Sequence, residues 1–331
     1  MKAAFQDQFG SPSILFINEV ERPAIAPDQI LVRVHASPVT QGDRRLRAAD
    51  FPGISAVIGR LMFGLFRPRN PIPGTMFAGR VVETGDEVTR FAVGDDVFGS
   101  VDNSAQAEYV AVAEDGAVAR MPAGVDYAEA AAVPYGAATA LSFLRDVGRV
   151  QPGDKVLIVG ASGGVGRYAV QIARHLGAEV TGVCSERHAE LVRSLGATRV
   201  IDYAKQDYTA GDATYDVIFD TSSGGGFRAA RKVLAPSGRY LTVYLNLLVL
   251  AQMLVTAVLG GPKVQGAVVL GNQELTRDVA DLLAQGAIRP VLAAQFPLDQ
   301  VVEAHAELED RRPGGEVMVL IGSPPAQQMA S

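Results

Sequence analysis

The chain has 331 residues, more than one ordinary core accommodates, and its 48% apolar and 20% charged residues indicate a folded protein of two domains. The net charge of −6, with no basic run or aromatic-interleaved basic patch, excludes nucleic acid as an expected partner. The one cysteine, Cys184, leaves no disulfide framework and no multi-cysteine zinc cluster, and it fits a reducing compartment. Because the first residues lack the long apolar run of a signal peptide, we expect a cytoplasmic protein.

The first 120 residues read as short strands separated by glycine and proline turns, which predicts an all-β domain. Strands are expected over residues 14–17, 30–34, 79–83 and 107–112, and the stretch 94–99 reads as a turn leading into a strand. An apolar insertion at 51–66 interrupts this pattern. It is either a surface helix that covers the β domain or a lid over an apolar substrate, and the sequence leaves both open.

A glycine-rich turn at residues 160–166 follows the apolar strand 156–159 and continues as a helix to Leu176. The strand 179–184 then completes a βαβ unit. This arrangement is the dinucleotide-binding fingerprint, with Ala161 in place of the first glycine.

The glycines of this turn have distinct tasks. A Cβ at Gly163 would keep a pyrophosphate away from the backbone N–H groups at the helix start, and Gly166 lets the helix pack tightly on the strand. A plain connecting turn is the alternative. The flanking strand and helix favour a nucleotide site.

The turn after the second strand of this unit indicates which nucleotide binds. An NAD site places an acidic side chain there, where it accepts hydrogen bonds from the ribose 2′-hydroxyl. This turn carries Ser185 and Arg187, a hydroxyl and a guanidinium that suit a 2′-phosphate, so we favour NADPH over NADH. Glu186 does not fit this prediction, because its charge would repel the phosphate. The alternative is that Glu186 faces solvent. The alternative is that Arg187 and His188 are the solvated start of the next helix.

Strands and helices alternate along the middle of the chain, which predicts a doubly wound parallel sheet and an α/β fold class. An alanine-rich helical stretch at 126–144, interrupted by Pro134, precedes it. Further elements are expected as helix 186–195, strand 200–203, strand 215–220, helix 227–234 and strand 239–243.

No charged residue occurs between Arg239 and Lys263, an interval of 23 positions (263 − 239 − 1). Its length reaches that of a membrane span, but a strand takes the first part, and Asn246, Gln252 and Thr256 interrupt the rest. We therefore expect a buried or interface helix and no membrane span. The remaining elements are expected as a strand at 268–270, helices at 273–284 and 299–309, a strand at 316–320 and a disordered tail over 324–331.

Several stretches, in this order along nearly the whole chain, resemble the medium-chain dehydrogenase/reductase superfamily. They are the strand and turn at 81–99, the glycine fingerprint, the stretch 195–203 and the stretch 286–305. Within the superfamily the chain resembles the zinc-independent quinone oxidoreductase branch. The resemblance implies a GroES-like β-barrel-type catalytic domain of residues 1–122 and 267–331, a Rossmann NADP-binding domain of residues 123–266, and a homodimer.

Zinc-dependent relatives carry ligands at positions that differ here. This chain has Thr40 where they have a cysteine, Thr75-Met76 where they have a histidine and glutamate, and Tyr135 near their third ligand. A catalytic zinc needs three nitrogen, sulfur or carboxylate ligands. The four histidines, at 35, 175, 188 and 305, lack metal spacing. The expectation is a protein without a metal.

The resemblance also implies site residues. The pyrophosphate would contact Ser162, Gly163, Gly164, Val165 and Gly166, and the 2′-phosphate would contact Ser185 and Arg187. Tyr203 would lie against the adenosine phosphate, or else pack at a strand end, and Thr139 and Val243 would lie nearer the nicotinamide. Thr40 and Tyr135 are the catalytic candidates, with a packing role as the alternative for Tyr135. Asp43 is expected to brace Arg44 or Arg47.

These inferences together predict a zinc-independent NADPH-dependent oxidoreductase that transfers hydride to a quinone or an α,β-unsaturated carbonyl. The cofactor carries the reactive hydride and the protein supplies orientation and electrostatics. The substrate is expected to be a small apolar electrophile. The alternatives are an alcohol dehydrogenase that works without zinc, and a catalytically idle NADPH-binding sensor or partner protein.

Overall fold

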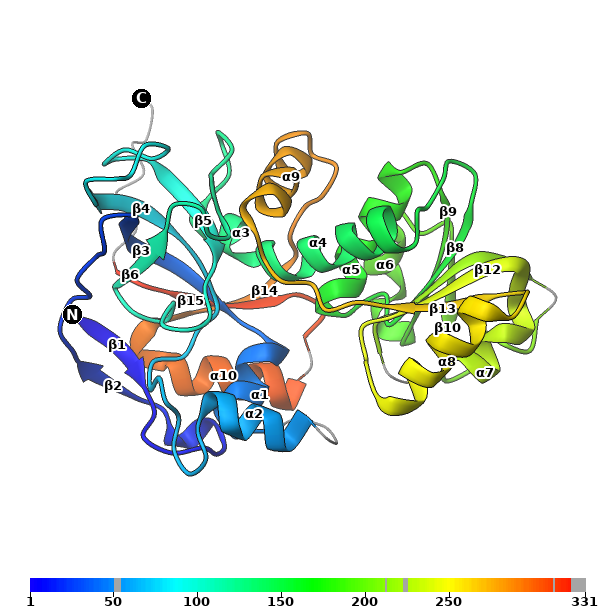
Figure 1. The fold of residues 1–331 in the computed structure, drawn as a ribbon, viewed down its shortest axis with the longest axis horizontal. Coiled ribbons are helices and arrows are strands. Elements are labelled where there is room, and N and C mark those ends of the chain that lie inside the picture. Colours follow the sequence, from blue (N-terminus) through cyan, green and yellow to red (C-terminus); the bar gives the residue numbers. More distant parts are fainter. Residues whose placement is uncertain (51–54, 212, 223–225, 312, 323–331) are drawn as a thin grey trace. The chain divides into compact units, whose positions relative to one another are not determined.

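Two sheets organise the chain in this computed structural model, which describes residues 1–50, 55–211, 213–222, 226–311 and 313–322 (Figure 1). The residues fall into two compact units. One comprises Met1–Tyr135, Gly271–Ala284 and Pro290–Ser331, and the other comprises Gly136–Leu270 and Gln285–Arg289. The predicted α/β class is confirmed, because one unit contains a largely antiparallel sheet and the other a parallel, doubly wound sheet.

The first unit contains a largely antiparallel sheet with, among the described residues, seven strands. Its order is β14-β15-β3-β4-β5-β7, and β6 pairs with β3. The central strand β3 alternates buried and half-exposed side chains over part of its length, as a sheet with one face on the core requires. The bounds are β3 (Gln29–Val39), β4 (Met76–Thr84), β5 (Asp96–Ser100), β6 (Tyr109–Ala113), β7 (Val118–Arg120), β14 (Leu292–Pro297) and β15 (Glu316–Leu320).

Helices and a small hairpin surround this sheet. The hairpin pairs β1 (Lys2–Phe5) with β2 (Phe16–Glu19). A buried apolar cluster that includes Val32, Phe77 and Val317 forms the core of the unit. The remaining elements are the short turns η1 (Pro12–Ile14) and η5 (Leu298–Gln300), and the helices α1 (Gln41–Ala48), α2 (Ser55–Phe63), α3 (Tyr127–Ala132), α9 (Gln273–Ala284) and α10 (Val301–Arg311).

The second unit is built on a parallel sheet of six strands, counted over the residues that the structure describes, in the order β10-β9-β8-β11-β12-β13. The order reverses between β8 and β11, and sheets of this kind bind ligands at the carboxyl ends of the strands beside such a reversal. The bounds are β8 (Lys155–Val159), β9 (Glu179–Cys184), β10 (Arg199–Asp202), β11 (Tyr215–Asp220), β12 (Leu234–Thr242) and β13 (Lys263–Gly266).

The helical segments of this region follow the predicted alternation with strands. Proline at the first position of α4 separates it from α3, which explains the interruption of the alanine-rich stretch. The bounds are α4 (Pro134–Leu141), a π-helical turn η2 (Ser142–Val147), α5 (Gly164–His175), η3 (Glu186–His188), α6 (Ala189–Ser194), α7 (Phe227–Ala230), η4 (Arg231–Val233) and α8 (Leu247–Val258).

Several predicted elements differ from the structure. The apolar residues 268–270 form no strand, because the preceding segment, β13, takes the place beside β12. Residues 14–17 begin as the turn η1, and the strand starts only at Phe16. The helix α8 has no buried residue, so the buried alternative for this helix is wrong, and the interface alternative stays a prediction. Of the predicted apolar insertion and tail, residues 51–54 and 323–331 lie outside the described residues.

None of the helices, over the residues that are described, combines the length and the apolar character that a bilayer crossing requires.

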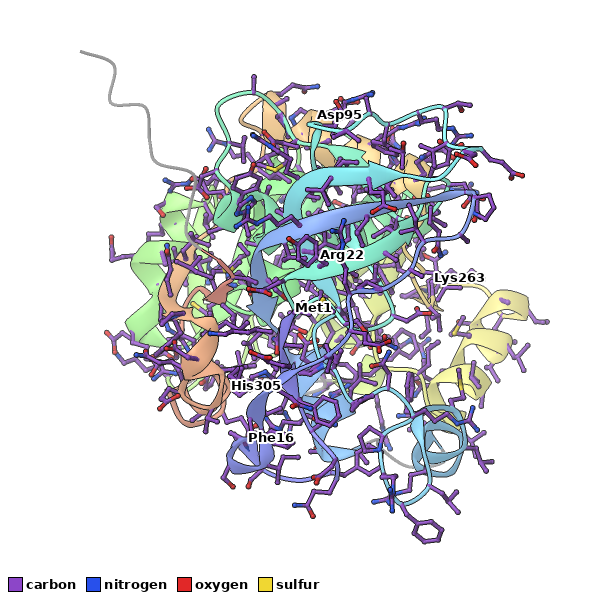
Figure 2. All side chains as sticks on the ribbon, turned by 90° about the vertical axis from the view of Figure 1, so that its left-hand side faces the viewer. Met1, Phe16, Arg22, Asp95, Lys263 and His305 are labelled. Atoms are coloured by element: carbon purple, nitrogen blue, oxygen red, sulfur yellow. The ribbon has the colours of Figure 1, made fainter. Side chains whose placement is uncertain are left out.

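A buried polar cluster joins α1 to α10 in the first unit. Arg47, 2% exposed, pairs with Glu309 and donates to the carbonyl oxygen of Gly10 at 3.1 Å. Its Nη1 lies 2.9 Å from Nδ1 of His305, which is labelled in Figure 2. Because arginine can only donate, Nδ1 of His305 accepts, and its Nε2 carries the proton that faces Oε1 of Gln106 at 3.1 Å.

Burial, followed by the nearby charge of Arg47, lowers the pKa of His305 to about 3. The unfolded value is about 6.5, so between these values the native state binds fewer protons than the unfolded chain. The contribution of His305 to stability is therefore complete above about pH 6.5 and is lost as the pH falls toward 3.

We predict that His305→Gln flattens the acid loss of stability. The glutamine can still accept from Arg47 and donate to Gln106, but it takes up no proton. Below about pH 6.5 the wild type should lose up to about 1.4 kcal/mol more per pH unit than the variant. Urea unfolding at pH 7.5, 6 and 5 measures this slope, with the exposed His175→Gln as control. Parallel slopes for wild type and His305→Gln would contradict the assignment.

Candidate cofactor and active site

The glycine-rich turn of the second unit presents the start of α5 at the carboxyl end of β8. The N–H groups of Gly160 and Ala161 donate to the carbonyl oxygen of Val183 at 3.1 and 2.9 Å, which ties the turn to β9. Gly163 is the N-cap of α5 and has no side chain to cap it. Both Gly163 and Gly164 are exposed. A helix start with accessible N–H groups and the positive end of the helix dipole is suited to a phosphate.

The glycines of the turn have different reasons to be glycine. A Cβ on Gly166 would lie 2.1 Å from the carbonyl oxygen of Gly160, so this position sets the distance between α5 and β8. Gly160 has φ +81°, and a Cβ there would also meet Oγ1 of Thr221 at 2.8 Å. At Gly163 the nearest atom to an added Cβ is the same Gly160 oxygen, at 3.2 Å, and the position faces outward. Gly166 therefore serves packing, whereas Gly163 keeps the helix start open.

Arg167 lies directly behind the turn and was missed by the sequence analysis. Its side chain is 3% exposed, and its Nη1 donates to the carbonyl oxygen of Ser162 at 2.8 Å. It adds a buried positive charge to the positive end of α5. The available signal was its place one residue after the last glycine, where the helix side chain turns back over the preceding turn.

The turn after β9 gathers a second positive group of residues. Oγ of Ser185 lies 3.4 Å from Nδ1 of His188, and both residues are half-buried. Burial lowers the pKa of His188, and the positive charges of Arg187 and Arg167 lower it further. Arg167, beside the glycine turn, and Arg187, in the β9 turn, therefore both exert their positive field at His188. An anion bound there would reduce their mutual repulsion.

Glu186, the discordant residue of this turn, is paired with a lysine. Its Oε2 lies 2.5 Å from Nζ of Lys205, and both side chains are largely exposed. Hydrogen bonding to Glu186 raises the pKa of Lys205. Lys205 follows β10, which is parallel to and paired with β9, so the turns after the two strands meet. The pairing neutralises the one acidic side chain of the β9 turn.

The other predicted cofactor residues of this unit have the following surroundings. Tyr203 donates its N–H to the carbonyl oxygen of Cys184 at 3.2 Å, but its side chain is 65% exposed, which differs from the burial of a packing residue. Thr139 is buried in α4, and Val243 is half-buried directly after β12. Val165 and Ser162 are half-buried at the turn. Their contacts with a cofactor stay predictions.

The catalytic candidate Thr40 belongs to a hydrogen-bonded cluster in the first unit. It is the N-cap of α1: the N–H of Asp43 donates to its Oγ1 at 3.1 Å, and its own N–H and Oγ1 donate to Oδ2 of Asp43 at 2.8 and 2.6 Å. Oγ1 of Thr75 donates to Oδ1 of the same carboxylate at 3.1 Å. The prediction from sequence that Asp43 braces Arg44 or Arg47 is wrong, because the Asp43 carboxylate binds Thr40 and Thr75 instead. Arg44 pairs with Asp50, and Arg47 belongs to the His305 cluster.

Asp43 is 2% exposed, and burial raises the pKa of its carboxyl group, although the bonds from Thr40 and Thr75 oppose that rise. Two of the three positions that hold zinc ligands in metal-dependent relatives, Thr40 and Thr75, are thus joined through one carboxylate. The structure also brings the third candidate near this cluster, because the N–H of Tyr135 contacts Sδ of Met76 at 3.2 Å. The Tyr135 side chain itself is 54% exposed.

Within the described part of the chain, no three histidine, cysteine, aspartate or glutamate side chains come together as a metal site would require.

Comparison with known proteins identifies two family models along the chain. The model described as "Alcohol dehydrogenase GroES-like domain" matches residues 26–142, and that described as "Zinc-binding dehydrogenase" matches residues 195–319. The second match does not include the positions of Thr40, Thr75 and Tyr135.

Among curated proteins, the chain is 30% identical to 2-methylene-furan-3-one reductase of Solanum lycopersicum, covering 96% of this chain and 79% of that protein. It is 29% identical to the chloroplastic NADPH-dependent alkenal/one oxidoreductase of Arabidopsis thaliana, with the same coverage of 96% and 79%. Among solved structures, the quinone oxidoreductase from Coxiella burnetii superposes with a TM-score of 0.84 at 26% identity, over 97% of this chain and 99% of the other.

We predict that substitutions at Gly163 and Gly166 separate binding from folding. Gly166→Ala forces α5 away from the Gly160 carbonyl and should destabilise the protein by about 1–3 kcal/mol. Gly163→Val should unfold near the wild-type temperature yet bind NADPH at least about 100-fold more weakly, because its side chain covers the helix N–H groups. Thermal unfolding and a fluorescence titration with NADPH measure the two effects. Tight NADPH binding by a folded Gly163→Val protein would refute a pyrophosphate site at this turn.

Proposed function

The chain belongs to the medium-chain dehydrogenase/reductase superfamily, in its quinone oxidoreductase-like branch, and from this premise we propose that it is an NADPH-dependent, zinc-independent reductase of quinones or α,β-unsaturated carbonyls. The observation that carries the proposal is the positive site at the ends of β8 and β9, with Glu186 neutralised by Lys205. A homodimer, expected from the resemblance, is part of the same proposal.

The preference for NADPH rests on charge. Ser185 and Arg187 offer a hydroxyl and a guanidinium to a 2′-phosphate, and Arg167 adds a buried positive charge nearby. In an NAD site the acid at the end of the second strand accepts from the ribose hydroxyls. Here the corresponding acid, Glu186, is held by Lys205. The relative from Arabidopsis thaliana is also described as NADPH-dependent.

Zinc independence rests on the chemistry of the Thr40–Asp43–Thr75 cluster. Threonine hydroxyls are poor zinc ligands beside thiolate, imidazole and carboxylate groups. The one carboxylate of the cluster already accepts three hydrogen bonds. A metal at this place would have to displace the cap of α1, which costs about 0.5–2 kcal/mol of stability.

The bound cofactor would supply a hydride to an electrophilic carbon or to a quinone, and the proton would come from water or from a nearby hydroxyl. The hydroxyl proton of Thr40 points at Asp43 in the structure. When Asp43 carries a proton, the bond can reverse, because the carboxyl group then donates to Thr40 and frees the Thr40 hydroxyl proton. In this proposal the Thr40 hydroxyl donates the proton to the substrate and receives a proton from the Asp43 carboxyl group. Tyr135 is the second candidate for the proton donor.

The proposed substrate class follows the relatives' names, which are a 2-methylene-furan-3-one reductase, an alkenal/one oxidoreductase and a quinone oxidoreductase. The alternative of a zinc-free alcohol dehydrogenase would need a side chain to remove a proton from the alcohol. In that case Thr40 and Asp43 would act in the opposite direction, with the Asp43 carboxylate accepting the proton of the alcohol through the Thr40 hydroxyl. An idle NADPH-binding protein would bind the cofactor and reduce none of these acceptors.

The direct test is turnover by chelator-treated protein. We expect oxidation of NADPH in the presence of an ortho-quinone or a simple enone, with the same rate before and after EDTA treatment and with NADPH favoured over NADH. Absorbance at 340 nm follows the reaction. An activity lost with EDTA and restored by zinc would overturn zinc independence. NADPH binding without turnover of any quinone, enone or alcohol would favour the idle protein.

We predict that Lys205 sets cofactor preference through Glu186. Lys205→Ala should expose the Glu186 carboxylate to the 2′-phosphate and lower the NADPH-to-NADH ratio of kcat/KM by about tenfold. Lys205→Ala combined with Glu186→Gln should restore most of that ratio, because the repelling charge is gone. Lys232→Ala, another exposed lysine of the same unit, is the control. A double variant no better than Lys205→Ala would mean that Lys205 contacts the cofactor without acting through Glu186.

A further inference from the structure

The end of α2 and the turn after it carry four large apolar side chains that the first unit leaves uncovered (Figure 1). Leu61, Met62, Leu65 and Phe66 are 56%, 60%, 47% and 85% exposed, and we call them the apolar tip. Single exposed apolar side chains are common on soluble proteins and need no explanation. Four within the stretch 61–66 form a patch, and patches of this kind mark interaction sites.

The turn that presents the apolar tip has a defined shape. Gly64, directly after α2, has φ +127°, and a Cβ there would lie 2.0 Å from the carbonyl oxygen of Arg67, so only glycine fits. The N–H of Gly64 donates to the carbonyl oxygen of Arg60 at 3.0 Å. The N–H of Arg69 donates to the carbonyl oxygen of Phe63 at 2.8 Å, which closes the turn. The exposed side chains therefore project from a hydrogen-bonded turn.

Side chains on both sides of this turn fix it further. The guanidinium group of Arg60, in α2, donates to the carbonyl oxygen of Leu65 at 3.1 Å. Beyond the turn, the side chain of Asn70 donates to Oγ of Ser104 at 3.1 Å and accepts the N–H of Ile72 at 3.0 Å. These bonds attach the turn to the rest of the first unit, so a surface that binds the tip also holds the unit.

The charges of this part of the chain are all positive. Neither aspartate nor glutamate occurs in the 32 positions between Asp50 and Glu83 (83 − 50 − 1), although the whole chain has a net charge of −6. Arg67 and Arg69 directly follow the tip and are exposed. Neither takes part in an ion pair with any residue that the structure describes. Guanidinium groups of this kind suit phosphate oxygens, which they bind in a fork.

We propose that the apolar tip, together with Arg67 and Arg69, is a docking surface for an anionic lipid membrane. The four apolar side chains enter the boundary between head groups and acyl chains, and the two arginines bind lipid phosphates above them. Leucine and phenylalanine beside arginine is the combination with which proteins lie on membranes. Each arginine near an anionic bilayer strengthens binding by about fivefold, so the local positive charge outweighs the negative charge of the chain elsewhere.

A protein partner fits the tip less well than a membrane. A specific protein interface covers about 800 Å² on each side, and the exposed parts of the four side chains supply roughly half of that area. A bilayer needs no such area, because a few inserted side chains and a few cations suffice for reversible binding. A lid over a substrate, the alternative suggested by the sequence, gives no reason for exposed arginines directly after the apolar side chains.

The docking surface does not depend on the reductase function, because its residues lie outside the Thr40–Asp43–Thr75 cluster. One consequence does rest on the proposed function. An apolar quinone or enone dissolves in lipid, so docking would bring the enzyme to the phase in which such a substrate is concentrated.

The first test is flotation of the full chain with vesicles of phosphatidylcholine, alone or with about 30% phosphatidylserine. We expect the wild type to bind the anionic vesicles at least about tenfold better, and to be released at about 0.5 M NaCl, because salt screens the attraction of arginine for phosphate. Two double variants, Arg67→Gln with Arg69→Gln and Leu65→Ser with Phe66→Ser, should each lower binding to anionic vesicles at least about tenfold.

Two control variants remove the same kinds of side chain elsewhere. Arg199→Gln with Arg277→Gln removes two exposed arginines, and Val93→Ser with Leu270→Ser removes two exposed apolar side chains. Both should bind the anionic vesicles as the wild type does. All the substituted side chains are exposed, so every variant should keep the wild-type unfolding temperature, which is measured alongside.

The second test reports insertion of the tip directly. The only natural cysteine, Cys184, is buried, so a polarity-sensitive fluorophore can be attached selectively to Phe66→Cys. Its emission should move to shorter wavelength when anionic vesicles are added, whereas the same fluorophore on Val93→Cys should show no shift.

Three outcomes would overturn the proposal. The first is a wild type that does not float with anionic vesicles at low salt, which would leave the tip to an acidic protein partner. The second is equal flotation of the wild type and both tip variants. The third is slower reduction of a water-soluble quinone by Leu65→Ser with Phe66→Ser in the absence of vesicles, which would make the tip a lid. Flotation needs no substrate, so its result is independent of whether the chain is a reductase.

Discussion

In the second unit Gly166 of α5 packs directly against the carbonyl oxygen of Gly160 at the end of β8. A Cβ there would lie 2.1 Å from that oxygen, so α5 can approach the strand only because the side chain is a hydrogen atom. A second close approach occurs in β9, where a Cβ on Gly182 would lie 2.6 Å from the Val192 side chain of α6. Together these contacts bring two helix starts to the carboxyl edge of the sheet, and the candidate cofactor site depends on both.

The charge of each side chain at this site indicates the cofactor only when its neighbours on the adjacent turn are considered with it. Glu186 read alone favours an NAD site, and Arg187 read alone favours an NADP site. The parallel pairing of β9 with β10 brings Lys205 to Glu186, which removes the contradiction. An exposed ion pair of this type adds little to the stability of a protein. Its consequence lies in the field at the site, where neutralising one acid leaves Ser185, Arg187 and Arg167 to act on an anion.

The sequence predicted best those elements whose signal is local. The strands β9, β11 and β15 and the helix α9 begin and end where they were expected, since each has a continuous apolar or amphipathic pattern with clear ends. The helix α1 and its cap were not predicted, although Thr40 and Asp43 have the spacing of a capping box. The strands β1 and β7 were missed because four and three residues are too few to show a periodic pattern, and β14 was missed because its residues 293 and 294 are alanines, which have a low β propensity.

The remaining differences come from long-range contacts that a single sequence does not display. Residues 268–270 are as apolar as a strand, but only the structure reveals that 263–266 fills the place beside β12. The partners Arg47 and His305 are 258 positions apart. For α8 the difficulty is of another kind: a helix that is apolar on nearly every side gives no periodic signal, so its exposed face could not be distinguished from a buried one.

At the start of α1, the surroundings of the Asp43 carboxylate bear both on whether a metal can bind and on whether Asp43 can supply a proton. Asp43 is buried, and a buried carboxylate has to be paired or hydrogen-bonded, or else take up a proton. In a metal site a cation would satisfy it. Here the hydroxyls of Thr40 and Thr75 do so, and burial still raises the pKa of Asp43. Neutral donors stabilise the carboxylate less than a cation would, so replacing ligands by hydroxyls moves Asp43 toward its protonated form. In the proposed reductase, the hydroxyls of Thr40 and Thr75 would therefore account both for the absence of zinc and for a protonated Asp43 that can supply a proton.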